Sequence, residues 1–327
     1  MPEVSIIIPL CNCLELTRAC VASLEETIGH RHDFEVILVD NASTDGTSAW
    51  LATLAGSRYR VIRNATNRGY APANNAAAEI AQGKYLLLLN NDTVLLPGWL
   101  DPILRVLKRA PRAGVVGNVQ RDAESGLIVH VGVRFTHGGY PLHAGKGDVA
   151  PPTEEYARWP AVTAACCAIS RDLFARLGGF DEKFVNGYED IDLCLKAGAV
   201  GYRNYVANRS VIYHHISATP GRSDKNVENF DYFSRRWGGL LSARLAIHLV
   251  GRQRQFALVE ERALADFVTA EERRLHEHGR VDGWRYLQKH ALRPWHYNAR
   301  RFWQALRGIL AALPRGKPDI DVVNLFE

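Results

Sequence analysis

Short apolar runs separated by amphipathic stretches make up the first third of the chain. The runs are β-branched or leucine-rich and too short for buried helices, which predicts strands covered on both faces. Their alternation with helical spacing predicts a parallel, doubly wound α/β sheet with right-handed crossovers. The predicted strands are residues 4–9 (VSIIIP), 35–40 (EVILVD), 59–63 (YRVIR) and 85–90 (YLLLLN). The predicted helices are residues 14–27, a helix that follows the turn at 41–46 and ends at residue 54, and residues 72–82.

The pattern changes in the second third. Residues 127–135 alternate as in an antiparallel strand, and residues 136–160 are rich in Gly, Pro and His without a steady period. An irregular segment of that length is typical of a substrate-facing loop. The remaining predicted elements are helices at 99–109, 171–177 and from about 190, strands at 113–119, 161–169 and 202–213, and helical structure from residue 227.

Polar residues follow four of the predicted strands. Because the carboxyl ends of parallel strands share one edge of the sheet, these residues should converge on a crevice. A carboxylate preceded by amides, as in Asn90-Asn91-Asp92, suits a divalent cation holding a phosphate, although the same triplet also suits a simple turn. The polar strand ends are residues 9–12, Asp40, residues 64–67 and residues 90–92.

Composition and charge narrow the class of protein. The 327 residues are 47% hydrophobic and 23% charged, as in a soluble globular protein, and no G-x-G-x-x-G or P-loop pattern follows a strand. The net charge of +5 gathers after Arg235, which suggests an anionic partner surface, but no nucleic-acid-binding motif accompanies it. Six scattered cysteines, no signal-peptide pattern and no apolar run of about 18 residues predict a cytoplasmic protein.

Five motifs in order give a specific resemblance. They are VSIIIP (4–9), VDNASTDG (39–46), NRGYA (67–71), LLNNDT (88–93) and GYEDIDLCL (187–195). Together they resemble a family 2 glycosyltransferase, an inverting enzyme of the GT-A fold, and within it the bacterial rhamnosyl- and galactofuranosyltransferases of cell-surface polysaccharides. The resemblance implies a nucleotide-sugar-binding half at residues 1–120 and an acceptor-binding, catalytic half at 121–238. Residues 239–327 would form a C-terminal helical region.

The resemblance also implies roles on the donor side. It makes Asp40 the reader of a pyrimidine base, with Pro9 and Asn67 beside that base. Without the resemblance, a cap for the turn that follows is the favoured interpretation of Asp40. The chain departs from the family pattern at Pro72-Ala73, where a glycine pair is expected, and this leaves the donor sugar open.

A metal site is implied at the family's D-x-D position. Asn90-Asn91-Asp92 occupies it, with an amide in place of the first acid, so Asp92 is the expected ligand. His214 falls where related enzymes place a further ligand, and an imidazole suits Mn²⁺ better than Mg²⁺. Which of His214 and His215 points inward depends on the strand register.

The mechanism needs a carboxylate on the acceptor side. The attacking hydroxyl loses a proton as it reaches the anomeric carbon, and Asp190 is the expected base, oriented or assisted by Glu189. Both carboxylates would also simply favour the start of a helix. The expected reaction moves a sugar from dTDP-rhamnose or a UDP-sugar to a growing glycan or lipid-linked saccharide.

Two rival functions and one unassigned region remain. A sugar-phosphate nucleotidyltransferase would need a basic glycine-rich loop after the first strand, and residues 10–14 offer none. A non-catalytic glycan-binding protein on the same fold is the other rival.

After residue 239, Arg beside Trp and Tyr fits a helix on an anionic membrane surface. A packed helical subdomain or homodimer interface explains the same composition, and we favour it.

Overall fold

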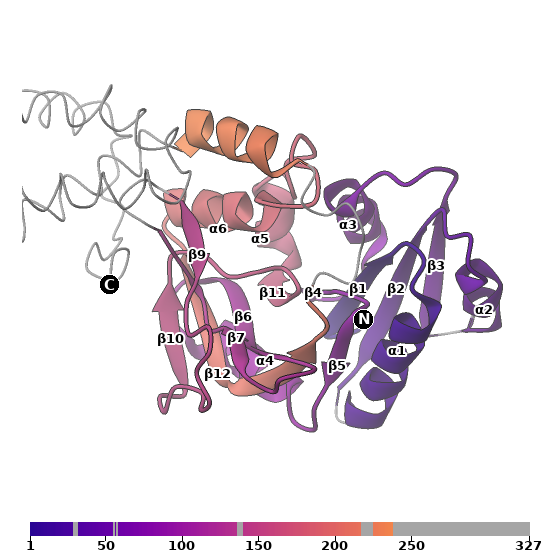
Figure 1. Ribbon diagram of the computed structural model, residues 1–327, viewed down its shortest axis with the longest axis horizontal. Helices are drawn as coiled ribbons and strands as arrows, with labels where there is room; N and C mark the ends of the chain where they lie inside the picture. The colour runs from indigo at the N-terminus through magenta and orange to yellow at the C-terminus, as the bar shows by residue number, and fades with distance from the viewer. Residues whose placement is uncertain (29–31, 55, 57, 136–139, 217–224, 238–327) are drawn as a thin grey trace, which may run out of the picture. The chain divides into compact units, whose positions relative to one another are not determined.

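A computed structural model describes residues 1–28, 32–54, 56, 58–135, 140–216 and 225–237 (Figure 1). The chain divides into two compact units, one of Met1–Arg134 with His143–Phe230 and one of Phe135–Leu142 with Asp231–Glu327. The first unit holds every candidate site residue. The expected helical region at residues 239–327 lies outside the described residues. No helix in the described ranges is long and apolar enough to cross a bilayer.

The first unit is built on one mixed sheet whose strands run in the order β10-β12-β6-β11-β4-β1-β2-β3. Its parallel part confirms the strands expected from the sequence, because β1 pairs in parallel with β2 and β4, and β2 with β3. The antiparallel strand β11 then separates β4 from β6, which runs parallel to β12. The bounds are β1 (Val4–Leu10), β2 (Phe34–Asn41), β3 (Tyr59–Asn64), β4 (Tyr85–Leu89), β6 (Ala113–Asp122), β11 (Cys166–Ser170) and β12 (Arg203–His214).

Short strands complete the second half. They are β5 (Thr93–Leu95), which pairs with the end of β12, β7 (Ile128–His130), which pairs with β6, and β10 (Tyr156–Trp159), which pairs with β12. A separate two-stranded sheet joins β8 (Val133–Phe135) and β9 (Pro141–His143).

Helices cover both faces of the sheet. Alternate residues of β1, Val4, Ile6 and Ile8, join one core with buried residues of α1 (Leu14–Ile28), α2 (Thr47–Leu54) and α4 (Leu100–Arg109). The intervening residues face the other way. On that side α3 (Tyr70–Ile80) contacts β1 and β2, while α5 (Arg171–Arg176) contacts β11 and α6 (Glu189–Ala199) contacts β6 and β12 (Figure 1). Burial on both faces explains the unbroken apolar runs of the sequence.

Three expectations for the second half were wrong. The segment 136–160 is not wholly a loop, because it supplies β9 and β10. The expected strand at 127–135 is broken into β7 and β8 at Gly132, whose φ is +137° and where a Cβ would lie 2.2 Å from the ring of Trp159. The expected strand at 161–169 begins only at Cys166. The residues before it form a loop at the site.

Candidate active site

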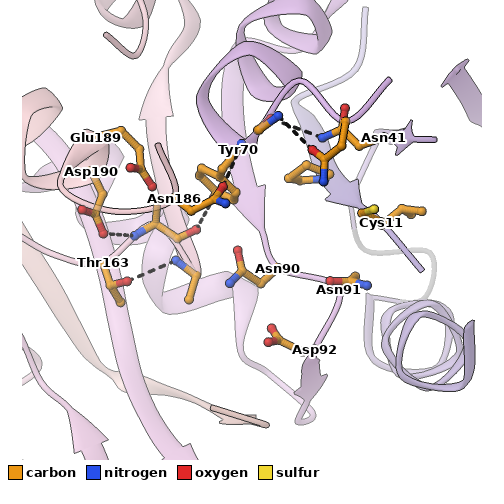
Figure 2. Close-up of a pocket in the computed structure, with 16 residues that line it drawn as sticks. Cys11, Asn41, Tyr70, Asn90, Asn91, Asp92, Thr163, Asn186, Glu189 and Asp190 are labelled. Carbon is orange, nitrogen blue, oxygen red and sulfur yellow. Dashed lines mark hydrogen bonds between the residues drawn. The ribbon is translucent and has the colours of Figure 1, made fainter. Parts of the chain in front are cut away.

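A polar pocket opens at the carboxyl ends of β1, β2 and β4 (Figure 2). The start of α6 and the loop before β11 close its other side. This is the position where open α/β sheets bind ligands. Of the residues expected from the sequence, the pocket is lined by Pro9, Asn67, Asn90, Asn91, Asp92, Glu189 and Asp190. Asp40 and His214 do not line it.

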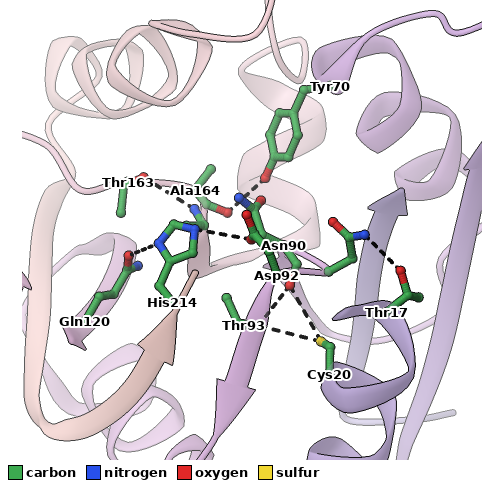
Figure 3. A network of polar contacts seen from close by, with 12 residues as sticks. Thr17, Cys20, Tyr70, Asn90, Asp92, Thr93, Gln120, Thr163, Ala164 and His214 are labelled. Atoms are coloured by element: carbon green, nitrogen blue, oxygen red, sulfur yellow. Dashed lines mark hydrogen bonds and ion pairs between the residues drawn. The ribbon is translucent and has the colours of Figure 1, made fainter. Parts of the chain in front are cut away.

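Sheet register brings His214 to Asp92. The end of β12 pairs with β5 so that His214 lies opposite Thr93, one residue beyond Asp92. The imidazole Nε2 of His214 lies 3.2 Å from the Asp92 Oδ1, and its Nδ1 lies 3.1 Å from the Gln120 Oε1 (Figure 3). His215 instead donates its backbone N–H to the Asp92 carbonyl. His214 is therefore the histidine that points inward.

The donor atoms around Asp92 fit a divalent cation. The Asp92 Oδ1, the His214 Nε2 and the Asn90 Oδ1 are buried and lack a well-aligned hydrogen-bond partner. The Gln120 amide donates from Nε2 to the Asn118 Oδ1, so its oxygen faces the His214 Nδ1 and favours a proton there. The Nε2 lone pair is then available to a metal.

Protein atoms alone supply few ligands for such a cation. Within the described ranges, no group of three or more His, Cys, Asp or Glu residues could hold a metal. A cation held by Asp92 and His214 would therefore draw its remaining ligands from phosphate oxygens, as Mg²⁺ and Mn²⁺ do in many phosphate-binding sites.

The base-binding side differs from expectation at Asp40. This carboxylate is 2% exposed and accepts the Ser43 N–H at 2.9 Å and the Ser48 hydroxyl. Asp40 thus caps the turn after β2, and its reading of a base stays a prediction. The following residue, Asn41, lines the pocket in its place and donates to the Gly69 carbonyl at 3.2 Å.

Cys11 is a pocket residue to which the sequence assigned no role, although it falls in the polar strand end at residues 9–12. It lies two residues beyond Pro9, at the same strand end. Burial raises the pKa of the Cys11 thiol, and the nearby Asp40 carboxylate raises it further. The thiol therefore stays protonated at neutral pH and offers a small, uncharged surface to a ligand.

Glu189 and Asp190 reach the pocket from the start of α6. The turn before this helix is tight, because Asn186 and Tyr188 have φ values of +52° and +73°. Glu189 is 6% exposed and accepts the Gly187 N–H at 2.6 Å through its Oε2. The Asp190 carboxylate accepts the N–H groups of Ala164 at 3.1 Å and Ile191 at 2.8 Å while still lining the pocket (Figure 2).

The pocket is acidic. Its lining in the described part of the chain contains Asp92, Glu189 and Asp190 and no Lys or Arg. Sequence reasoning also missed the remaining polar lining, namely Tyr70, Asn186 and the loop residues 163–165, which no strand-end pattern marks.

An acidic crevice at the carboxyl ends of the strands, with carboxylates on both walls, is where an α/β protein of this type binds a ligand. A family model narrows this class. Residues 5–178 match the family described as "Glycosyl transferase family 2", which is more than half of the chain. The chain belongs to glycosyl transferase family 2, and it has the GT-A fold, as the motifs indicated.

The chain is similar in sequence to several curated proteins, two of which are named for O-antigen synthesis or rhamnosyl transfer. It is 36% identical over 241 residues to "O-antigen biosynthesis protein RfbC" of Myxococcus xanthus, covering 71% of this chain and 18% of that one. It is 36% identical over 256 residues to the protein y4gI of Sinorhizobium fredii, covering 72% and 28%. The chain thus spans less than a third of either relative's length. An "N-acetylglucosaminyl-diphospho-decaprenol L-rhamnosyltransferase" of Mycobacterium tuberculosis is 28% identical, covering 57% and 68%.

Solved structures share the fold. A mannosyltransferase of Pyrobaculum calidifontis, solved with GDP-Man and Mn²⁺, superposes with a TM-score of 0.55 at 22% identity over 95% of this chain and 86% of that one. GalNAc-T7, solved with UDP, GalNAc and Mn²⁺, gives a TM-score of 0.55 at 17% identity over 65% and 44%.

Proposed function

We propose that this chain is a metal-dependent inverting glycosyltransferase that moves a sugar from a nucleoside diphosphate to a hydroxyl of a growing cell-surface glycan or lipid-linked saccharide. The observation that carries the proposal is that two aspartates, Asp92 and Asp190, lie on different walls of one pocket. Asp92, with His214 behind it, stands at the end of β4, and Asp190 faces it from α6. Such a pair can serve a leaving diphosphate and an attacking hydroxyl at the same time.

The donor-side residues would hold the leaving group. Asp92 and His214 would bind the cation, Mn²⁺ or Mg²⁺, which offsets the charge that develops on the departing diphosphate. Pro9, Cys11, Asn41 and Asn67 line the part of the pocket left for the nucleoside. Their polar atoms are amides and a protonated thiol, which suit an uncharged base.

The acceptor-side residues would manage the proton. As the acceptor oxygen bonds to the anomeric carbon, the bond from that carbon to the diphosphate oxygen breaks, and the hydroxyl proton passes to the Asp190 carboxylate. Asp190 already accepts two backbone N–H groups, which fix its orientation. Glu189 is anchored on Gly187 and would shape the turn or contact the acceptor. Attack from the face opposite the diphosphate inverts the anomeric centre.

The relatives support the choice of donor and acceptor. The mycobacterial relative is named for rhamnosyl transfer to a diphospho-decaprenol-linked sugar, and the Myxococcus relative for O-antigen synthesis. We therefore propose dTDP-rhamnose as the first donor to test and a UDP-sugar as the second. Structures of similar fold were solved with Mn²⁺, which supports a divalent metal here.

A binding screen followed by a turnover assay tests the proposal. The full chain is heated with UDP, dTDP or GDP, each with and without Mn²⁺. The matching nucleotide should raise the unfolding temperature only when Mn²⁺ is present, because a ligand that binds the folded state stabilises it by mass action. Release of nucleoside diphosphate from dTDP-rhamnose, with an N-acetylglucosaminyl-diphospho-polyprenol acceptor, then measures transfer.

Three outcomes distinguish the proposed function from a nucleotidyltransferase and from a non-catalytic glycan-binding protein. Release of pyrophosphate from a nucleoside triphosphate and a sugar phosphate would indicate a nucleotidyltransferase. Full turnover by the Asp190→Asn variant would reject Asp190 as the base. If no nucleotide binds with or without Mn²⁺, the chain is better explained as a glycan-binding protein.

Peripheral membrane contact and a homodimer remain predictions on the C-terminal region. Flotation of the full chain with anionic vesicles at low salt, and sedimentation of the free protein, measure them separately. A chain that stays unbound at low salt has no electrostatic membrane contact.

A further inference from the structure

The loop of residues 163–165 lies between the two working sides of the pocket (Figure 3). Its contacts to the rest of the site use backbone groups. The Ala164 N–H donates to Asp190 at 3.1 Å, and the Ala165 carbonyl accepts the N–H of Asn90 at 2.9 Å. The loop therefore contacts the Asp190 carboxylate on the acceptor side and Asn90, the first residue of the Asn90-Asn91-Asp92 triplet, on the donor side.

Tyr70 holds this loop in place from a third segment. Its hydroxyl donates to the Ala164 carbonyl at 2.8 Å, so both backbone polar groups of Ala164 are engaged, one by Tyr70 and one by Asp190. The tyrosine is itself fixed at its other end, where its N–H donates to the Asn186 Oδ1 at 3.3 Å. Tyr70 thus joins the start of α3, the 163–165 loop and the turn before α6.

The tyrosine hydroxyl is a lasting donor. Burial raises the pKa of Tyr70 well above its usual value of 10, so the O–H is present throughout the working pH range. The ring also packs on Phe180, with a centroid distance of 5.9 Å, so a phenylalanine at this position would keep the packing and lose only the hydroxyl. Packing and hydrogen bonding can therefore be tested separately.

We propose that Tyr70 is a positioning residue, which orients the Asp190 carboxylate through the backbone of Ala164. The proposal rests on the proposed role of Asp190 as the base. Without the hydroxyl, the Ala164 carbonyl loses its partner and the loop can shift, and the N–H that orients Asp190 shifts with it. Displacement of a catalytic group by about 1 Å costs on the order of 100-fold in rate, so even a smaller shift is measurable.

The test compares Tyr70→Phe with Tyr59→Phe. Tyr59 is a matched control because its hydroxyl donates to the exposed Glu25, away from the pocket. Steady-state release of dTDP from dTDP-rhamnose gives kcat and KM, and calorimetry with dTDP and Mn²⁺ gives the nucleotide Kd. If the thermal screen selects another nucleotide, that nucleotide and its sugar replace them.

We expect Tyr70→Phe to lower kcat about 10-fold. This is less than the roughly 100-fold loss for a 1 Å displacement, because the loop loses only one of its hydrogen bonds. The nucleotide Kd should stay close to wild type, and the unfolding temperature should fall by about a few degrees at most, because one carbonyl loses its partner. Tyr59→Phe should leave kcat and the nucleotide Kd unchanged. A kcat within twofold of wild type would overturn the inference. A rise in the nucleotide Kd as large as the fall in kcat would also overturn it, because Tyr70 would then contact the donor directly.

The inference and the proposed function can fail separately. An inactive Asp190→Asn variant beside a fully active Tyr70→Phe variant rejects only the role of Tyr70. An active Asp190→Asn variant rejects the base itself, whatever Tyr70→Phe does.

Discussion

The two ends of the parallel sheet both bury polar side chains, and they treat them differently. At the amino end, Glu35 accepts the Ser5 hydroxyl at 2.6 Å and the Gln82 N–H at 2.6 Å, and pairs with Arg60 at 2.9 Å. At the carboxyl end, Asp92 and His214 lie 3.2 Å apart with atoms that have no aligned partner. A buried polar group without a partner is costly.

This difference separates a structural cluster from a binding site. At the amino end the Glu35 carboxylate is satisfied by protein groups, so it needs no ligand to be stable. In the proposed function, the carboxyl-end cluster would gain its partners from a bound ligand. Stability at that point is given up for function, as is common at active sites. The predictions below break or sharpen this contrast.

The largest effect is expected at Asp190. Replacing it by Asn keeps the size and removes the base, so the transfer rate should fall by on the order of 1,000-fold, within the range of general base catalysis. The nucleotide Kd should hold. Rapid-quench measurement of nucleoside diphosphate release checks the rate, and a loss of nucleotide affinity of similar size would argue instead for a binding role.

The next effect is on stability, at the satisfied cluster. Glu35→Ala removes the acceptor of the Ser5 hydroxyl, the Gln82 N–H and Arg60, so the free energy of unfolding should fall by about 2–4 kcal/mol. Urea unfolding measures it. The kcat of the protein that remains folded should be unchanged, and a large drop in kcat would show that the two ends are coupled.

Asp92→Ala should do the reverse. Removal of an unsatisfied carboxylate should leave the free energy of unfolding unchanged or slightly higher. The nucleotide Kd with Mn²⁺ should rise about 10- to 100-fold. The Kd without metal should stay the same or fall, because one carboxylate that repels the bare diphosphate is gone. Calorimetry of both conditions is the measurement, with the exposed Glu15→Gln as control. Equal weakening with and without Mn²⁺ would exclude Asp92 as a metal ligand.

The smallest effect concerns acid stability at His130. Burial lowers its pKa well below 6.5, and nearby His143 and His214 lower it further. The unfolded chain therefore binds a proton below pH 6.5 that the folded chain does not, so stability falls as the pH drops from 6.5 toward the folded pKa, by at most about 1.4 kcal/mol per pH unit. His130→Gln should flatten this slope in urea titrations, and an unchanged slope would contradict the prediction.

The parallel half of the fold and the donor side of the pocket were predictable because both follow from local pattern. Buried strands leave apolar runs, and the carboxyl ends of those strands must share an edge, so Asn90, Asn91 and Asp92 could be placed without coordinates. Even the choice between His214 and His215 needed only the register, which the sequence does not encode locally.

The loop before β11 was not predictable. Residues 161–165 (AVTAA) are small and, except for Thr163, apolar, and locally they look like the start of a strand. Their backbone groups instead bond to Tyr70, Asn90 and Asp190, which are distant in the chain. Because Ala164 acts through its backbone, no side-chain motif records it. The role of Asp40 was obscured for the opposite reason, since its motif is clear but its carboxylate is already engaged by Ser43 and Ser48.

The absence of Lys and Arg from the pocket lining in the described ranges has a thermodynamic consequence. Three carboxylates repel a bare diphosphate, while a cation on Asp92 attracts it. Metal and nucleotide should then bind with positive cooperativity, and by linkage each must raise the affinity of the other by the same factor. The concentration of free divalent cation would thereby set how tightly the enzyme holds both its donor and its spent nucleotide.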